Sequence, residues 1–102
     1  MQAKVLIIED ELEIAELVGL YLEKEGIASR ICETGEDGLA ALQEQSYDLI
    51  VLDLNLPGID GFEFLQQARR TSSIPIVIVS SRDSDEDMVL GLGIGADDFI
   101  PK

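Results

Sequence analysis

Three short apolar runs, each ending in a polar group, constrain the fold of this chain more than any other feature. They cover residues 5–8, 49–52 and 76–79, with the sequences VLII, LIVL and IVIV. Runs that are apolar at every position are typical of parallel strands buried on both faces, whereas a strand with one solvated face alternates apolar and polar residues. We therefore expect a sheet whose central strands are covered on both sides.

The segments between these runs carry helical periodicity. Five apolar residues recur with the spacing i, i+3, i+4, i+7, i+8 and predict one helix face: Ile14, Leu17, Val18, Tyr21 and Leu22. Further helices are expected over 35–45, 61–70 and 84–94, the last being weakest because three glycines lower its helix propensity. Gly26 is a plausible cap for the end of the first helix.

Two weaker strands complete the pattern. Residues 28–32 alternate as an edge strand does, and residues 98–100 fit a fifth strand. Strands that alternate with helices form βαβ units, in which the strands pair in parallel through right-handed crossovers. The expected fold is α/β: a doubly wound, five-stranded parallel sheet with helices on both faces.

Charge and residue content exclude several functions. The 102 residues fit one domain, and 46% hydrophobic content is too high for a disordered acidic tail. A net charge of −14 argues against binding to nucleic acid or to an anionic membrane, and suits a cation or a basic partner. Cys32 is the single cysteine, so no internal disulfide forms, and without histidine there is no internal phosphohistidine. We expect a small, soluble, cytoplasmic domain with no signal peptide.

Polar residues directly follow the carboxyl ends of the expected strands. Ligands bind at these ends in open α/β sheets. Glu9 and Asp10 follow the first run, Asp53 follows the second, Ser80 the third, and Lys102 the fifth strand. Three converging carboxylates repel one another unless a cation lies among them, and oxygen ligands suit Mg²⁺. A carboxylate beside Mg²⁺ and a lysine is a reasonable phosphoryl acceptor.

Each of these residues alone has a simpler explanation. Glu9 and Asp10 could be an acidic cluster at a helix N-terminus, and Asp53 and Ser80 could be cap or turn residues. The triplet of glycines at 91–95 lacks the spacing and position of a dinucleotide-binding loop. The combination is more specific than any member, because all of the polar groups fall at strand ends of one sheet.

Four segments carry a resemblance to a known family. Val5–Asp10 (VLIIED), Asp48–Gly61 (DLIVLDLNLPGIDG), Pro75–Ser81 (PIVIVSS) and Gly95–Lys102 (GADDFIPK) resemble the receiver domain of two-component response regulators. The resemblance runs through the whole chain in order. It implies a flavodoxin-like fold with strand order 2-1-3-4-5, and residues 1–102 as a single receiver domain.

The resemblance also implies site residues. Asp53 matches the phosphoacceptor, Asp10 a direct Mg²⁺ ligand, Glu9 a water-mediated ligand, and Asn55 the residue whose backbone carbonyl reaches the metal. Pro57 and the glycine after it match the turn that follows the acceptor.

Three further positions match the parts that respond to the phosphoryl group. Ser80 matches the switch hydroxyl, Lys102 the phosphate-binding lysine, and Phe99 the switch aromatic, which is expected to turn inward on phosphorylation. The implied partner is a sensor histidine kinase, and the stretch 82–87 resembles regulators that carry a winged-helix DNA-binding output domain. The domain itself would be no enzyme beyond its own phosphoryl transfer and dephosphorylation.

Receivers normally continue after this lysine into a fifth helix, whereas this sequence stops after the fifth strand. We therefore expect part of one sheet face to lack cover, exposing residues such as Leu6, Ile8, Ile50 and Leu52, and a homodimer is one way to cover them.

The residues also allow functions of other classes. A haloacid dehalogenase-like Mg²⁺-dependent phosphotransferase is the main alternative. Such enzymes require a second acidic residue two positions after the first, and Asn55 occupies that position here. A flavodoxin-type electron carrier would have its phosphate repelled by Glu9 and Asp10. An inert receiver-like scaffold is disfavoured by the intact Asp53, Asp10 and Lys102.

Overall fold

Five strands pair in parallel in the order β2-β1-β3-β4-β5 in the computed structural model, which describes residues 2–102. Their bounds are β1 Lys4–Ile8, β2 Ala28–Cys32, β3 Leu49–Leu52, β4 Ile76–Ser80 and β5 Asp98–Pro101. The predicted fold class and strand order are confirmed. The order reverses between β1 and β3, and such a switch point is where α/β sheets bind ligands.

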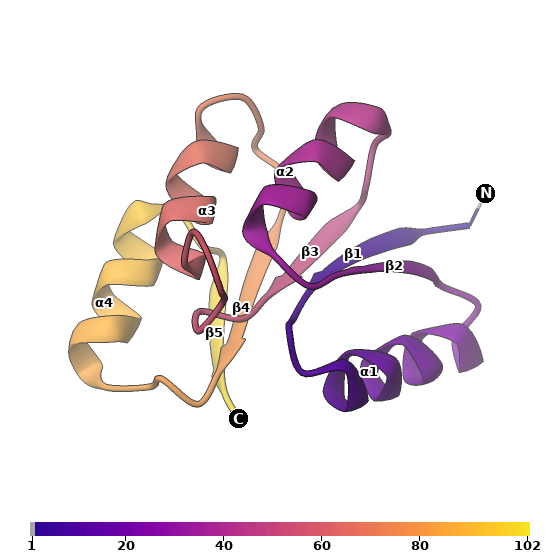
Figure 1. Cartoon of the computed structure of the whole chain (residues 1–102), viewed down its shortest axis with the longest axis horizontal. Helices are drawn as coiled ribbons and strands as arrows, with labels where there is room; N and C mark the ends of the chain where they lie inside the picture. The colour runs from indigo at the N-terminus through magenta and orange to yellow at the C-terminus, as the bar shows by residue number, and fades with distance from the viewer. Residues whose placement is uncertain (1) are drawn as a thin grey trace.

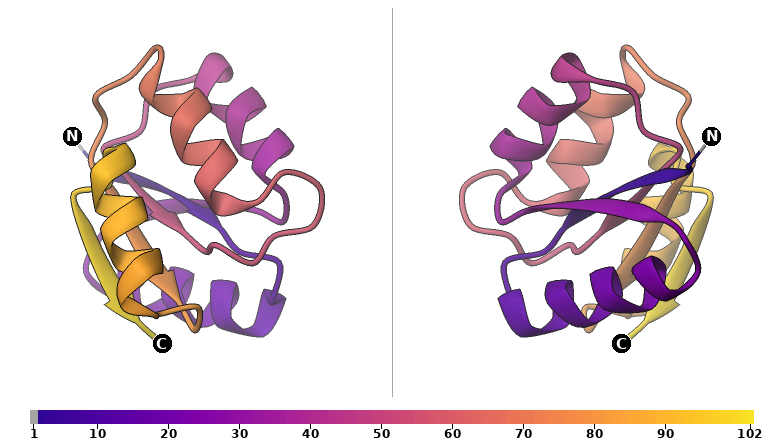
Figure 2. Two further views of the ribbon diagram at one scale, coloured as in Figure 1. Left: turned by 90° about the vertical axis from the view of Figure 1, so that its left-hand side faces the viewer. Right: turned by 90° about the vertical axis from the view of Figure 1, so that its right-hand side faces the viewer.

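Within the described residues, four helices cover the two faces of this sheet (Figure 1). Their bounds are α1 Leu12–Lys24, α2 Gly35–Glu44, α3 Gly61–Arg69 and α4 Asp85–Ile94. Figure 2 shows α1 below the sheet and α2 and α3 above it. No helix within residues 2–102 is long and apolar enough to cross a membrane.

Local sequence determines where these helices begin and end. The side chains of Thr34, Asp60 and Ser84 each accept a hydrogen bond from a backbone N–H three residues later, as N-caps do. After α1, Gly26 adopts a φ of 76°, its N–H donates to the carbonyl of Glu23, and the next N–H reaches back to Leu22. This pattern is a Schellman motif in which Glu25 is the C-cap and Gly26, predicted as the cap, is the glycine that directly follows it.

The apolar residues of the sheet divide between two cores. Leu6, Ile8, Ile50 and Leu52 are fully buried in the larger core, on the side of α2 and α3. The expectation that they lack cover is wrong, because alternate residues of a strand point to opposite faces and these four point toward α2 and α3.

The α1 side holds a smaller core built on Val5, Ile7 and Ala15. Beside α1, an apolar hollow of about 300 Å³ is lined by Val51, Val77 and other residues of the sheet. The less covered face therefore exists, but it is formed by the alternate residues of the same strands.

Candidate functional site

Three carboxylates meet at the carboxyl ends of β1 and β3. Glu9 and Asp10 directly follow β1, Asp53 follows β3, and one ligand oxygen from each lies within 4.8 Å of the others. The two strands are neighbours in the sheet, with Ile8 paired to Leu52, so the residues that follow each strand lie side by side. Glu9 and Asp53 are buried and Asp10 is exposed, so solvent reaches the cluster on the side of Asp10.

The backbone orients the carboxylate of Asp53. Its own N–H donates to the carbonyl of Ile8 at 2.9 Å, which ties the residue to β1. The N–H of Leu54 donates to Oδ1 at 2.8 Å. One carboxylate oxygen is thereby held by the chain, and Oδ2 is left to face the charged groups.

Lys102 extends from just past β5 into the acidic cluster. Its Nζ lies 2.6 Å from Glu9 Oε1, 3.5 Å from Glu11 Oε1 and 3.6 Å from Asp53 Oδ2. The backbone N–H of Lys102 donates to the carbonyl of Ser80, which fixes where the side chain starts. Since only Glu9 is within hydrogen-bonding distance, the ammonium bonds Glu9 and contributes charge alone at Asp53.

These contacts perturb the titration of two groups. Burial raises the pKa of Glu9 from 4.5 to about 6, aided by the neighbouring Asp53 and opposed by the hydrogen bond from Lys102. Burial by itself would lower the pKa of Lys102, but the hydrogen bond to Glu9 and the charges of Asp53, Glu9 and Glu11 together raise it. Lys102 therefore stays cationic at neutral pH.

The two predicted switch residues lie on β4 and β5. Ser80 is fully buried at the end of β4, and its Oγ accepts a hydrogen bond from the N–H of Arg82 at 3.1 Å. Phe99 is buried in β5, with its ring near Gly91 of α4. The Phe99 ring is therefore already buried in this conformation. The predicted inward turn of Phe99 would start from a conformation other than this one.

Asn55 lies in the loop between β3 and α3 and is exposed, two residues beyond Asp53. The loop continues through Gly58, whose φ of 73° favours glycine because a side chain is strained there. The resemblance implied this turn at Pro57 and Gly58.

Sequence reasoning missed the part played by Gly61. A Cβ at this position would lie 2.5 Å from the carbonyl oxygen of Asp53 and 2.7 Å from the Cα of Leu54. The first turn of α3 therefore packs directly on the backbone that carries Asp53, which only glycine allows. The available signal was a glycine at the first position of a helix, directly after the capping Asp60.

The cluster fits a small, hard cation. All of its donors are carboxylate oxygens, which Mg²⁺ prefers, and the open side through Asp10 leaves room for the water that Mg²⁺ retains. Two buried carboxylates against one lysine also leave excess negative charge, which a divalent cation offsets.

A family model described as "Response regulator receiver domain" matches residues 5–102. The chain belongs to this family. Among curated relatives, the transcriptional regulatory protein AfsQ1 of Streptomyces coelicolor is 47% identical over 97 residues, covering 95% of this chain and 43% of the relative. The sensory transduction protein RegX3 of Mycolicibacterium smegmatis is 41% identical over 98 residues, covering 96% and 43%. The receiver thus spans less than half the length of these relatives.

Solved receiver structures agree with the fold. A two-component response regulator from Clostridium difficile superposes with a TM-score of 0.96 at 28% identity, covering 99% of this chain and 84% of that one. The BeF3-activated N-terminal receiver domain of Klebsiella pneumoniae RstA gives 0.93 at 33% identity, covering 97% and 85%. This receiver is therefore a signalling domain of the response-regulator type, and nothing in the comparisons supports the dehalogenase alternative.

Proposed function

We propose that this receiver accepts a phosphoryl group on Asp53 from a phosphohistidine of a sensor kinase, and that the modification regulates a transcriptional output. The observation that carries the proposal is the surroundings of one carboxylate. Asp53 is buried, lies 3.6 Å from the ammonium of Lys102, and shares a cluster with Glu9 and Asp10.

In this proposal the two oxygens of Asp53 have different tasks. Leu54 holds Oδ1, so Oδ2 is the nucleophile. As the Oδ2–P bond forms, the P–N bond of the donor breaks and the departing imidazole nitrogen takes up a proton from solvent. Lys102 neutralises charge on the transferring group, as electrostatic stabilisation of phosphoryl transfer requires.

Mg²⁺ would be held by Asp10, Asp53 and the backbone carbonyl of Asn55, with Glu9 behind a water molecule, and when bound it would neutralise phosphoryl oxygens. The excess of carboxylates over cations in the cluster supports this ligand set. Because Lys102 already bonds Glu9, that carboxylate is the least free of the three to bind metal directly.

Ser80 supplies the response. Its hydroxyl accepts from the N–H of Arg82, which leaves its own proton free to donate to a phosphoryl oxygen on Asp53. That bond exists only in the phosphorylated form, and such a differential contact is what a switch requires. The response would reach α4, which packs close to the already buried ring of Phe99 at Gly91.

The relatives support the partners in this proposal. Transcriptional regulators that extend well beyond this receiver support a DNA-binding output domain of the winged-helix kind, and the net charge of −14 assigns nucleic-acid contact to that domain rather than to this one. In this proposal, the receiver's own chemistry is limited to its phosphoryl transfer and hydrolysis. A cytoplasmic location, a homodimer and the treatment of residues 1–102 as one domain stay predictions.

The test is intact-mass spectrometry after incubation with acetyl phosphate and Mg²⁺. We expect the mass of one phosphoryl group on the wild type and none on Asp53→Asn. Asp83→Asn, which changes an exposed carboxylate in the loop after β4, is the matched control and should be modified like the wild type. A phosphoryl group that persists on Asp53→Asn would move the acceptor elsewhere.

A further inference from the structure

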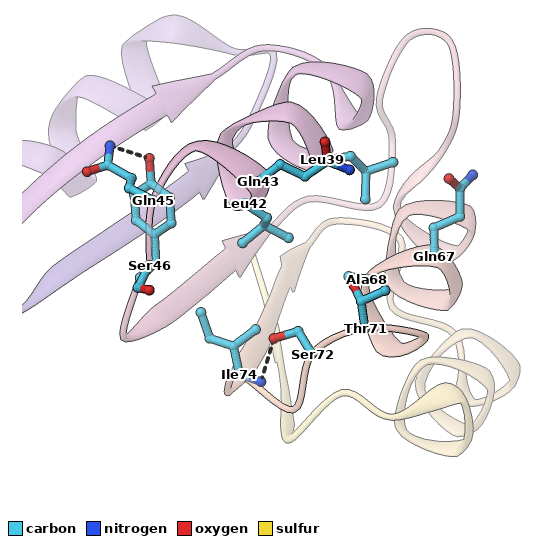
Figure 3. Close-up of a pocket in the computed structure, with 11 residues that line it drawn as sticks. Leu39, Leu42, Gln43, Gln45, Ser46, Gln67, Ala68, Thr71, Ser72 and Ile74 are labelled. Atoms are coloured by element: carbon cyan, nitrogen blue, oxygen red, sulfur yellow. Dashed lines mark hydrogen bonds between the residues drawn. The ribbon is translucent and has the colours of Figure 1, made fainter.

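A hollow of about 370 Å³ is lined by the eleven residues drawn in Figure 3. Its walls come from the C-terminal halves of α2 and α3 and from the loops that lead into β3 and β4. It therefore lies at the amino ends of the two strands whose carboxyl ends carry Asp53 and Ser80. No residue assigned above to phosphorylation is among the described residues that line it.

The lining combines an apolar floor with an uncharged polar rim. Leu42, Ala68 and Ile74 belong to the main core or pack against it, and they supply the floor. Figure 3 shows Leu42 approaching from α2 and Ile74 from the loop before β4. The exposed hydroxyl groups of Ser46 and Thr71 lie on the rim. Apolar walls with a few polar groups are the usual make-up of small-molecule sites, and the volume lies within their range.

The lining differs from the rest of the surface in its charge. Charged residues make up 27% of the chain, so eleven residues would contain about three of them on average. The eleven described residues that line the hollow include no Asp, Glu, Lys or Arg. The ammonium of Lys4, which donates to Gln45 Oε1 at 2.7 Å, lies outside this lining. A charged ligand would therefore lose its hydration without a charged side chain among the lining residues to replace it. The negative ends of the α2 and α3 dipoles and the overall charge of −14 disfavour an anion further.

We propose that this hollow binds an uncharged small molecule that combines an apolar ring with an amide or hydroxyl group. The ring occupies the floor between Leu42, Ala68 and Ile74, and the polar group reaches the hydroxyl and amide groups of the rim. This site is separate from the phosphorylation site and does not depend on the function proposed for it.

The test uses three probes of nearly equal shape and different charge: benzamide, benzoate and benzamidine. Each is titrated into the ¹⁵N-labelled protein, and backbone amide shifts are followed by NMR. Benzamide should shift the amides of Leu42, Ala68 and Ile74 with a dissociation constant on the order of 10 mM, as expected for a ligand of this size. Benzoate and benzamidine should bind there about five-fold more weakly or worse, because no charged side chain is among the residues that line the hollow.

A pair of variants checks the location. Thr71→Asp places a carboxylate on the rim, whereas Ser73→Asp adds the same charge two residues later, at an exposed position outside the lining. Thr71→Asp should weaken benzamide binding about five-fold or more, and Ser73→Asp should leave it unchanged. The probe series needs no variant, so it decides the question even if Thr71→Asp disturbs the fold.

Three results would overturn the proposal. The first is the absence of shifts at Leu42, Ala68 and Ile74 at benzamide concentrations well above the expected constant. The second is benzoate or benzamidine binding at these amides as tightly as benzamide. The third is equal weakening of benzamide binding by the two variants.

Discussion

Replacing Glu9 by glutamine should change how the stability of the receiver depends on pH. The substitution keeps the shape of the side chain but removes its ability to ionise. Glu9 is almost completely buried, and its pKa is raised from 4.5 to about 6, mainly by that burial. A carboxyl group that binds its proton more tightly in the folded state makes folding less favourable once the pH is high enough to ionise it.

The sign and size follow from linkage. Below pH 4.5 Glu9 is protonated in both the folded and unfolded states and has no effect on pH dependence. Between pH 4.5 and about 6 the folded state holds more protons, so the free energy of unfolding falls as the pH rises. A shift from 4.5 to about 6 corresponds to a loss of at most about 2 kcal/mol, complete by pH 7. Glutamine has no such loss.

The assay is urea unfolding of both proteins from pH 4.5 to 7 in the presence of EDTA. The stability of Glu9→Gln relative to the wild type should rise across this range by up to about 2 kcal/mol. Glu16→Gln removes the same charge from an exposed position of α1 and should give a difference that does not vary with pH. The reasoning is refuted if the Glu9→Gln difference is constant across this range or falls with pH.

The fold was predictable because buried parallel strands have an unusual composition. Runs such as Ile76–Val79 are apolar at every position, and few other structures require that. Even the weakest helix, α4, formed where expected despite its glycines. Gly91 explains why: a Cβ there would lie 2.7 Å from the side chain of Ile78, so the glycine that lowers helix propensity also lets α4 approach the sheet.

The buried face of α1 shows what periodicity leaves undetermined. The pattern predicted that Leu17 and Tyr21 belong to the apolar face, but they are 53% and 63% exposed. The helix instead contacts the sheet through Ala15, which is fully buried, with Ile14 and Val18 beside it. Because the small side chain of Ala15 lies at the centre of the contact with the sheet, the buried face of α1 is narrower than its apolar face. The spacing of apolar residues does not predict how wide the buried face is.

At the site, residue identities were predictable and their pairing was not. The positions of Glu9, Asp10 and Asp53 after the strands were enough to predict that they lie close together, because the carboxyl ends of adjacent parallel strands lie side by side. That Lys102 bonds Glu9 at 2.6 Å while staying 3.6 Å from Asp53 depends on side-chain positions to within an ångström. The raised pKa of Glu9 likewise depends on burial, which no motif encodes.

Three further substitutions probe the site and its support. Mg²⁺ at a hundred-fold excess over its dissociation constant should raise the melting temperature of the wild type by about 10 °C or more and that of Asp10→Ala much less, whereas equal responses would remove Asp10 from the metal site. Ser80→Ala should still gain the phosphoryl mass but lose the phosphorylation-induced NMR shifts over α4, and unchanged shifts would reject Ser80 as the switch. Gly61→Ala should lower the free energy of unfolding by about 1–3 kcal/mol and slow phosphorylation, because its methyl group would meet the backbone of Asp53 at 2.5 Å and displace the acceptor. Gly93→Ala is the matched control: it lies in α4 with nothing within 4 Å of the added methyl group, so it should stabilise the protein by about 0.5–1 kcal/mol. Urea unfolding and acetyl phosphate kinetics measure both effects, and a Gly61→Ala protein as stable and as reactive as the wild type would show that the loop carrying Asp53 yields without cost.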